Sequence, residues 1–197
     1  MLNRTLCVVA LAASSLLTAC GADTVARTGF IPKSVPMSKV DGDTSSYKVK
    51  GFELSQFGKV VVEPIQGPPT NEGKIEPKDM EDLRARFQTS LQKSLEATGG
   101  KGDRTLVVRA SITALKPNKP LLNAAPQTQI LKRGYGYAAC EIYATDGTDG
   151  QTMAAWMNTQ DTQRFGTEKL SELGTAQKAC EEWGPAFRAF ITETKSK

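Results

Sequence analysis

The 197-residue chain contains no histidine. Without an imidazole side chain it can form neither a Ser-His-Asp triad nor a Cys-His dyad, and a zinc site with histidine ligands is excluded. Basic residues are only slightly in excess, with 25 Lys and Arg against 21 Asp and Glu and a net charge of +4. Nucleic-acid-binding domains carry a clustered basic surface instead. The composition therefore argues against histidine-dependent hydrolases and against a nucleic-acid partner.

The N-terminal apolar run, from Leu6 to Leu17, is too short to cross a hydrocarbon core of about 30 Å. Arg4 precedes the run, and this layout is typical of a secretory signal. The run ends in Leu17-Thr18-Ala19-Cys20-Gly21, which resembles the lipobox of bacterial lipoproteins. The sequence thus predicts a signal peptide over residues 1–19 and lipidation of Cys20. The alternative is an ordinary signal whose cleavage leaves Cys20 unmodified.

The predicted lipid on Cys20 makes a membrane the first expected partner. Several acyl chains on one residue hold a protein stably, whereas one chain binds weakly. In enteric-type bacteria, Asp directly after the lipidated cysteine generally retains a lipoprotein in the inner membrane. Here Gly21 has that place and the nearest acid is Asp23. We therefore expect the protein at the periplasmic face of the outer membrane.

Residues 20–46 are expected to form a flexible, lipid-attached tether. The stretch is rich in small, polar, Pro and Gly residues and has no sustained period of 2 or 3.6. Gly29-Phe30-Ile31-Pro32 interrupts it with an apolar pair, which either docks on the domain or belongs to a mobile linker. Residues 47–197 should form a single α+β periplasmic domain.

Four strands are expected from the apolar patterns. The run from Lys59 to Ile65 predicts a buried strand, and the alternation from Leu106 to Leu115 predicts a half-buried one. Two further strands, near Ile130 to Thr145 and Gln151 to Thr159, should form a hairpin around Asp146-Gly147-Thr148-Asp149-Gly150.

Two amphipathic helices complete the expected fold. The first begins near Pro77, carries an apolar stripe and ends at Gly99-Gly100. The second spans about Leu173 to Thr194. The order β-α-β-β-β-α predicts an α+β two-layer sandwich, in which a mixed four-stranded sheet carries two helices on one face.

Cys140 and Cys180 should point into the same layer, between the sheet and the last helix. We expect a disulfide between them in the oxidising periplasm. Two buried free thiols are the alternative, because a slip of one residue in register would turn Cys140 away from the helix.

The opposite sheet face carries Tyr135, Tyr137, Glu141 and Tyr143. Two helices on one side would leave this face open, so it is a candidate surface for a partner or a ligand. The alternative is that these are half-exposed aromatic residues favoured by their β-propensity.

Neither a metal site nor a cofactor is expected. The segment from Asp146 to Gly150 lacks the third acid and the distal Glu of a calcium-binding EF-hand, so a hairpin turn is the better interpretation. Gly134-Tyr135-Gly136-Tyr137 lacks the glycine spacing of a phosphate loop.

The charged residues near the sheet give no catalytic constellation. Glu63, Glu141 and Asp146 are the carboxylates expected on or beside the sheet, and nothing places two of them at acid/base distance. Four basic residues flank the long loop and either face anionic lipid or glycan or are simply solvated: Lys116, Lys119, Lys132 and Arg133.

Short motifs of the mature chain resemble an uncharacterised family of Gram-negative lipoproteins known as a domain of unknown function. They are Gly29-Phe30-Ile31, Lys59 to Pro64, Arg109 to Thr113, Pro120 to Asn123, and Glu141 ahead of the Asp146 turn. The turn departs from the Asp-Ser-x-Thr-Gly-Glu usual in that family. More distantly, the strand-helix-strand start is similar to the curli secretion lipoprotein and to activators of penicillin-binding proteins, which are interaction modules.

These observations favour a non-enzymatic, lipid-tethered periplasmic module that binds a protein or another envelope component. One alternative is a hydrolase of envelope glycan or lipid that uses carboxylates or a Ser-Lys pair. Another is a carrier of a small apolar ligand, which would need an enclosed pocket of about 300 Å³ or more.

Overall fold

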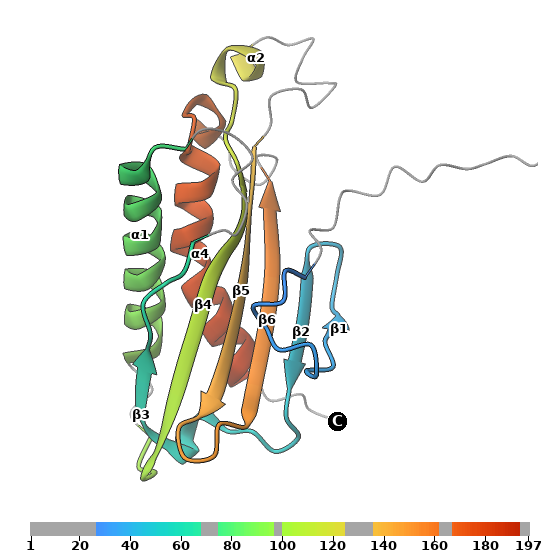
Figure 1. Ribbon diagram of the computed structural model, residues 1–197, viewed down its shortest axis with the longest axis vertical. Coiled ribbons are helices and arrows are strands. Elements are labelled where there is room, and N and C mark those ends of the chain that lie inside the picture. Colours follow the sequence, from blue (N-terminus) through green and yellow to red (C-terminus); the bar gives the residue numbers. More distant parts are fainter. Residues whose placement is uncertain (1–26, 68–74, 97–99, 125–135, 162–166, 194–197) are drawn as a thin grey trace, which may run out of the picture.

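A computed structural model describes residues 27–67, 75–96, 100–124, 136–161 and 167–193. These residues form an α+β fold with a six-stranded mixed sheet. Figure 1 shows α1 and α4 packed together against the sheet, with α2 beyond one end of it. The expected signal peptide and Cys20 lie outside the described residues.

The strands are arranged in the order β1-β2-β6-β5-β4-β3. β3 and β4 run parallel, and the other neighbouring pairs are antiparallel. The strands are β1 (Ser38–Lys39), β2 (Thr44–Lys48), β3 (Phe57–Val62), β4 (Arg104–Lys116), β5 (Tyr137–Asp146) and β6 (Thr152–Asp161). The α-helices are α1 (Pro77–Glu96), α2 (Pro120–Ala124) and α4 (Gly174–Thr192), and the 3-10 turns are η1 (Leu54–Gln56) and η3 (Thr167–Leu170). Within these ranges, no helix combines the length and the apolar character needed to cross a membrane.

The expected four-stranded sheet with two helices is wrong. The two additional strands, β1 and β2, come from residues 38–48, of which 38–46 were expected to belong to the tether. Most of these residues are polar and show no apolar alternation, so the pattern gave no reason to predict strands. β2 exists because it pairs along the edge of β6, from Thr44 opposite Asn158 to Lys48 opposite Ala154. The third helix, α2, lies in the region expected to be a loop.

The core lies between the sheet and the α1 and α4 pair. Trp183 on α4 is fully buried and packs on Phe87 of α1, with ring centroids 5.0 Å apart. Its indole N–H donates a hydrogen bond to Oδ1 of Asn158 on β6 at 3.1 Å, so burial leaves no polar atom of the ring unsatisfied. The apolar stripe expected on the first helix is confirmed, since its five members are buried: Met80, Leu83, Phe87, Leu91 and Leu95.

The backbones of the two long helices lie close together at Gly184. A Cβ atom there would lie 2.4 Å from the carbonyl oxygen of Ser90 on α1. The next residue, Pro185, has no backbone N–H, so the carbonyl of Glu181 loses its usual partner within α4. The hydroxyl of Ser90 donates to this carbonyl at 2.7 Å. Glycine and proline thus fix where the helices touch.

Candidate functional site

The sheet face opposite the helices is covered by the protein's own N-terminal strap, which we define as residues 27–37. Ile31 is fully buried and Val35 is nearly so, and both pack with Ala155 of β6. Four partly buried residues surround this second, smaller core: Met37, Tyr47, Tyr143 and Met157. The strap thereby closes much of the surface that two helices on one side would leave open.

Glu141 of β5 holds the beginning of the strap. Its carboxylate is 1% exposed. Oε1 accepts hydrogen bonds from the backbone N–H of Thr28 at 2.6 Å and from the Thr28 hydroxyl at 2.9 Å, and Oε2 accepts one from the N–H of Ile31 at 2.8 Å. Such bonds to a carboxylate are stronger than those between neutral groups. The buried Glu141 carboxylate therefore binds a distant segment of the same chain to the sheet.

Arg27 stabilises the strap by hydrogen bonds to backbone carbonyl groups within it. Its guanidinium donates to the carbonyl oxygens of Ile31 and Val35, each at 3.1 Å, and also to that of Pro32. Phe30 packs edge-on against Tyr143, with ring centroids 5.3 Å apart. Residues 27–35 are thus a compact turn held by Arg27 on itself and by Glu141 on the sheet.

The residues of the expected partner face have different places in the structure. Glu141 is buried beneath the strap, and Tyr143 is half-buried against Phe30. Tyr137 is half-buried at the start of β5, while Tyr135 lies outside the described residues. Of the two interpretations of Gly29-Phe30-Ile31-Pro32, docking is the one observed. The sequence pattern did not single out Arg27 and Thr28, whose only signal is their position directly before this apolar segment.

The other two carboxylates are engaged in ion pairs of their own. Glu63 pairs with Arg109 through two hydrogen bonds, Nε to Oε2 at 2.9 Å and Nη2 to Oε1 at 2.7 Å. Asp146 accepts a hydrogen bond from Nε of Arg104 at 2.8 Å. Each carboxylate singled out in the sequence therefore has a structural partner among the described residues.

The segment from Asp146 to Gly150 is a hairpin turn. Gly150 has a φ of 73°, a value that favours glycine, and its N–H donates to the carbonyl of Asp146 at 2.9 Å. The Asp146 side chain accepts the N–H of Thr148 at 2.9 Å. Among the described residues, no group of three or more Cys, Asp and Glu side chains is arranged to hold a metal ion.

Acid should weaken the contribution of Asp146 to stability. The hydrogen bond from the backbone of Thr148, followed by that from Arg104, lowers the pKa of Asp146 below its ordinary value. Its stabilising effect is therefore fully present above the pKa of an unfolded Asp, about 3.9, and is lost as the pH falls through the lower folded value. In urea unfolding, Asp146→Asn should be less stable than the wild-type protein at pH 7, and this difference should shrink as the pH falls below about 4. The exposed Asp103→Asn variant is the control, and a difference independent of pH would contradict the assignment.

The two cysteines lie in the main core, as expected, but the expected disulfide is not formed. Cys140 and Cys180 are both buried free thiols. Burial raises the pKa of each thiol well above its ordinary value. The structure therefore corresponds to the alternative of two buried free thiols. Cys140 faces the main core, as expected, but no disulfide joins it to Cys180 on α4.

Both thiols should be unreactive in the native protein. A buried thiol with a raised pKa supplies little thiolate, which is the reactive species. We expect neither Cys140 nor Cys180 to be alkylated under native, non-reducing conditions, and both to be alkylated in denaturant. Mass spectrometry of the peptides, with a reduced sample as control, measures this. A linked pair of peptides in the non-reduced sample would show that the bond forms after all.

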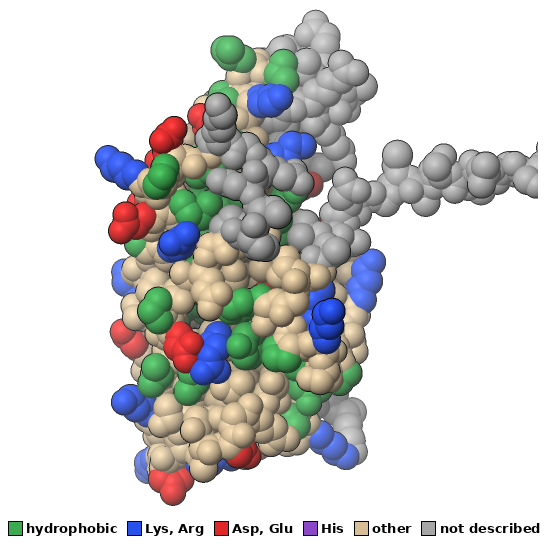
Figure 2. Space-filling view, viewed as in Figure 1, with side chains coloured by type: hydrophobic (Ala, Val, Ile, Leu, Met, Phe, Trp, Pro, Cys, Tyr) green, Lys and Arg blue, Asp and Glu red, His purple; other side chains and the backbone are tan. Residues whose placement is uncertain are grey.

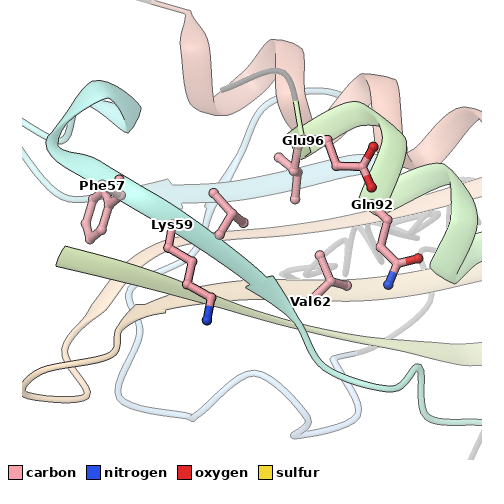
Figure 3. Close-up of a pocket in the computed structure, with 8 residues that line it drawn as sticks. Phe57, Lys59, Val62, Gln92 and Glu96 are labelled. Carbon is pink, nitrogen blue, oxygen red and sulfur yellow. The ribbon is translucent and has the colours of Figure 1, made fainter. Parts of the chain in front are cut away.

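A small hollow lies between the edge strand β3 and the end of α1. It has a volume of about 340 Å³ and is lined by Phe57, Gly58, Lys59, Val60, Val62, Gln92, Leu95 and Glu96. In Figure 3, Gln92 and Glu96 project from α1, whereas Lys59 extends away from that helix. The side chain of Gln88 accepts the N–H of Ile65 at 3.1 Å and donates to the carbonyl of Val62 at 3.4 Å. This hollow offers one carboxylate and one amine but no catalytic pair.

A larger surface groove of about 1040 Å³ lies between β1, β2, the segment after β2 and the end of α4. Lys48 spans part of it and donates to the backbone carbonyls of Phe190 and Glu193, at 3.0 Å and 2.6 Å. Its ammonium group satisfies the last carbonyls of α4, where a cation is favoured by the helix dipole. The groove is bordered by exposed residues such as Val40, so it is a surface feature and not an enclosed cavity.

The basic residues of the long loop are described only in part. Lys116 and Lys119 are exposed near the end of β4, whereas Lys132 and Arg133 lie outside the described residues, as does Gly134. Gly136 is buried and donates its N–H to Oδ1 of Asn118 at 2.8 Å. Its backbone thus packs against the loop after β4.

Comparisons with known proteins identify a family but no role. DUF3313, described as a protein of unknown function, matches residues 35–187. No curated protein matches the chain. Among solved structures, the chain is similar to the PelC dodecamer from Paraburkholderia phytofirmans, with 11% identity, a TM-score of 0.43, and coverage of 72% of this chain and 96% of that one. It is also similar to the hypothetical protein CT253 from Chlamydia trachomatis, with 11% identity, a TM-score of 0.39, and coverage of 68% and 98%.

Proposed function

The chain belongs to the DUF3313 family of proteins of unknown function, and we propose that it is a lipoprotein of the bacterial envelope. In this proposal Cys20 is acylated and anchors the protein to the periplasmic face of the outer membrane. The folded domain is then a non-enzymatic module that binds or assembles an envelope component. The distant similarity to assembly lipoproteins stays a prediction from the sequence.

The observation that carries the proposal is the position of the strap. The lipobox ends at Cys20, and the chain is already seated on the sheet at Arg27 and Thr28. The intervening residues reach at most about 25 Å when fully extended. A lipid on Cys20 would therefore keep the domain close to the leaflet, which suits a module that must meet its partner at the membrane.

The engaged carboxylates support a binding role over a catalytic one. A glycan hydrolase needs two carboxyl groups flanking its substrate in a cleft. In this protein Glu63 and Asp146 pair with arginines, and Glu141 is buried under the strap. A carrier of an apolar ligand needs a pocket that encloses most of the ligand, whereas the two hollows described above are bordered by exposed residues of the surface.

The anchor is tested by Cys20→Ala. We expect the unmodified protein to carry the mass of several acyl chains on Cys20 and to sediment with outer-membrane markers in a density gradient. The Cys20→Ala variant should lack that mass and lose its outer-membrane fractionation. Cys7→Ala is the matched control, because this cysteine lies within the expected signal peptide and should not affect the mature protein. An unacylated Cys20, or recovery mainly with inner-membrane markers, would contradict this part of the proposal.

The binding role is tested by capture from the envelope. Acylated protein purified from detergent-solubilised envelope should retain a specific partner, and the same procedure with an unrelated lipoprotein of similar size should not. Mass spectrometry of the bound material identifies the partner. Repeated recovery of no specific component would count strongly against a binding or assembly module.

A further inference from the structure

The end of the molecule that carries α2 exposes large apolar side chains. Leu121 is 90% exposed and Leu122 is 37% exposed on α2, and Leu170 of η3 is 53% exposed. Figure 2 shows hydrophobic and basic side chains together at this end, over α2. We call Leu121, Leu122 and Leu170 the leucine tip. Exposed apolar groups gathered on two contacting elements, α2 and η3, mark a surface that meets another apolar phase.

The leucine tip stands on a firmly held base. Asn118, which is 3% exposed, donates its backbone N–H to the carbonyl of Glu172 and its side-chain Nδ2 to the carbonyl of Ser171, both at 2.7 Å. Its Oδ1 accepts the N–H of Gly136 at 2.8 Å and the hydroxyl of Thr175 at 3.1 Å. One buried amide thus ties together the chain before α2, the chain before β5 and the start of α4. The leucines are presented by a fixed platform.

The exposed lysines near the leucine tip favour contact with an anionic surface. Lys116 and Lys119 are exposed next to α2, and Glu172 is an exposed acid nearby. Lysines close to a bilayer are attracted to anionic lipid headgroups, while apolar side chains between them enter the boundary of the acyl chains. A water-soluble anionic ligand would be bound by the lysines alone and would not require leucines that project outward from the surface.

The anchor and the leucine tip can reach the same leaflet. Glu141, which binds Thr28, lies four residues along β5 from Tyr137, a distance of about 13 Å. Tyr137 pairs with Lys116 at the end of β4, and α2 begins four residues later, at most about 14 Å away. From Cys20 to Thr28 the chain extends at most about 29 Å. The length of chain between lipid and strap therefore matches the distance from the strap to the tip.

We propose that the leucine tip inserts into the lipid leaflet that holds the acylated Cys20, with Lys116 and Lys119 against anionic headgroups. This inference rests on the proposed lipid anchor. The protein then contacts the bilayer at two points, the acyl chains and the tip. Two contacts fix the tilt of the domain, whereas the acyl chains alone would leave it free to rotate.

The test measures the depth of the leucine tip in a bilayer. Full-length Leu121→Trp protein is purified with its lipid and reconstituted into vesicles of phosphatidylethanolamine and phosphatidylglycerol that contain brominated lipid. Tryptophan favours the membrane interface, and the native Trp156 and Trp183 are buried. After subtraction of wild-type fluorescence, we expect quenching of Leu121→Trp to exceed that of Val40→Trp by about twofold or more. Val40 is the matched control because it is 62% exposed and directly follows β1, an edge strand of the sheet that is separated from β4 by three strands.

The outcomes separate the tip from the anchor. Acylated protein that floats with the vesicles while Leu121→Trp stays unquenched overturns the leucine tip and leaves the anchor standing. Equal quenching of Leu121→Trp and Val40→Trp overturns the tip as well. A preparation without acyl mass on Cys20 overturns the anchor, and quenching of its Leu121→Trp variant by added vesicles would still support the tip. Replacing phosphatidylglycerol with neutral lipid should reduce the quenching, because the two lysines lose their anionic partners.

Discussion

Glu141→Gln is expected to release the N-terminal strap from the sheet and to lower the free energy of unfolding by about 2 to 3 kcal/mol. The carboxylate accepts three hydrogen bonds, two of them from backbone N–H groups of Thr28 and Ile31. An amide keeps one acceptor oxygen and turns its NH2 group toward a donor. At least one buried N–H then lacks a partner, and the remaining bonds lose the charge that strengthens them.

Hydrogen exchange measures the release directly. In Glu141→Gln, the amides of residues 28–37 should exchange much faster, while those of β4 and β5 stay protected. Glu53→Gln is the matched control, because it makes the same change at an exposed position. Unchanged protection of the strap in Glu141→Gln would show that the apolar seat of Ile31 and Val35 holds the segment without the carboxylate.

Gly184→Val is expected to destabilise the contact between α1 and α4 strongly. A Cβ atom at this position would meet the backbone oxygen of Ser90 at 2.4 Å and its Oγ at 2.5 Å. Backbone cannot move aside as a flexible side chain does, so α1 and α4 must separate. Overpacking of this kind costs about 3 kcal/mol, and the larger gap also breaks the hydrogen bond from Ser90 to the carbonyl of Glu181.

Denaturant unfolding of Gly184→Val, followed by circular dichroism, tests the contact between the helices. The control is Ala189→Val, at an exposed position on the same helix. This substitution should lower the free energy of unfolding only by the difference in helix propensity, about 0.5 kcal/mol. Gly184→Ala should fall between the wild-type protein and Gly184→Val, because its gain in helix propensity offsets part of the clash. A Gly184→Val protein as stable as Ala189→Val would show that α1 and α4 do not meet closely at this point.

The strap changes what the tyrosine-bearing face of β5 can be used for. Tyr143 is covered in part by Phe30, and Glu141 is occupied by the strap. A partner that binds this face must therefore bind the strap as well or displace it. The leucine tip and the groove beside the end of α4 are open to solvent and are not covered by the strap.

The local pattern of the sequence determined the elements that bury a regular apolar face. The stripe of α1 and the alternation of β4 depend only on the spacing of apolar residues, so both elements and their buried positions could be predicted. The same holds for the Asp146 turn, because Asp and Gly in succession select a tight turn by their local conformational preferences.

Only the tertiary structure decided where the polar segments lie. β2 carries almost no apolar signal and becomes a strand because the edge of β6 offers it hydrogen bonds. The strap becomes ordered because Glu141, 110 residues away from Ile31 in the sequence, accepts its N–H groups. The two thiols likewise share a core without a bond, which their spacing along the chain does not reveal. Periodicity reports which faces are apolar, whereas these features depend on polar contacts between distant segments, and such contacts leave no period in the sequence.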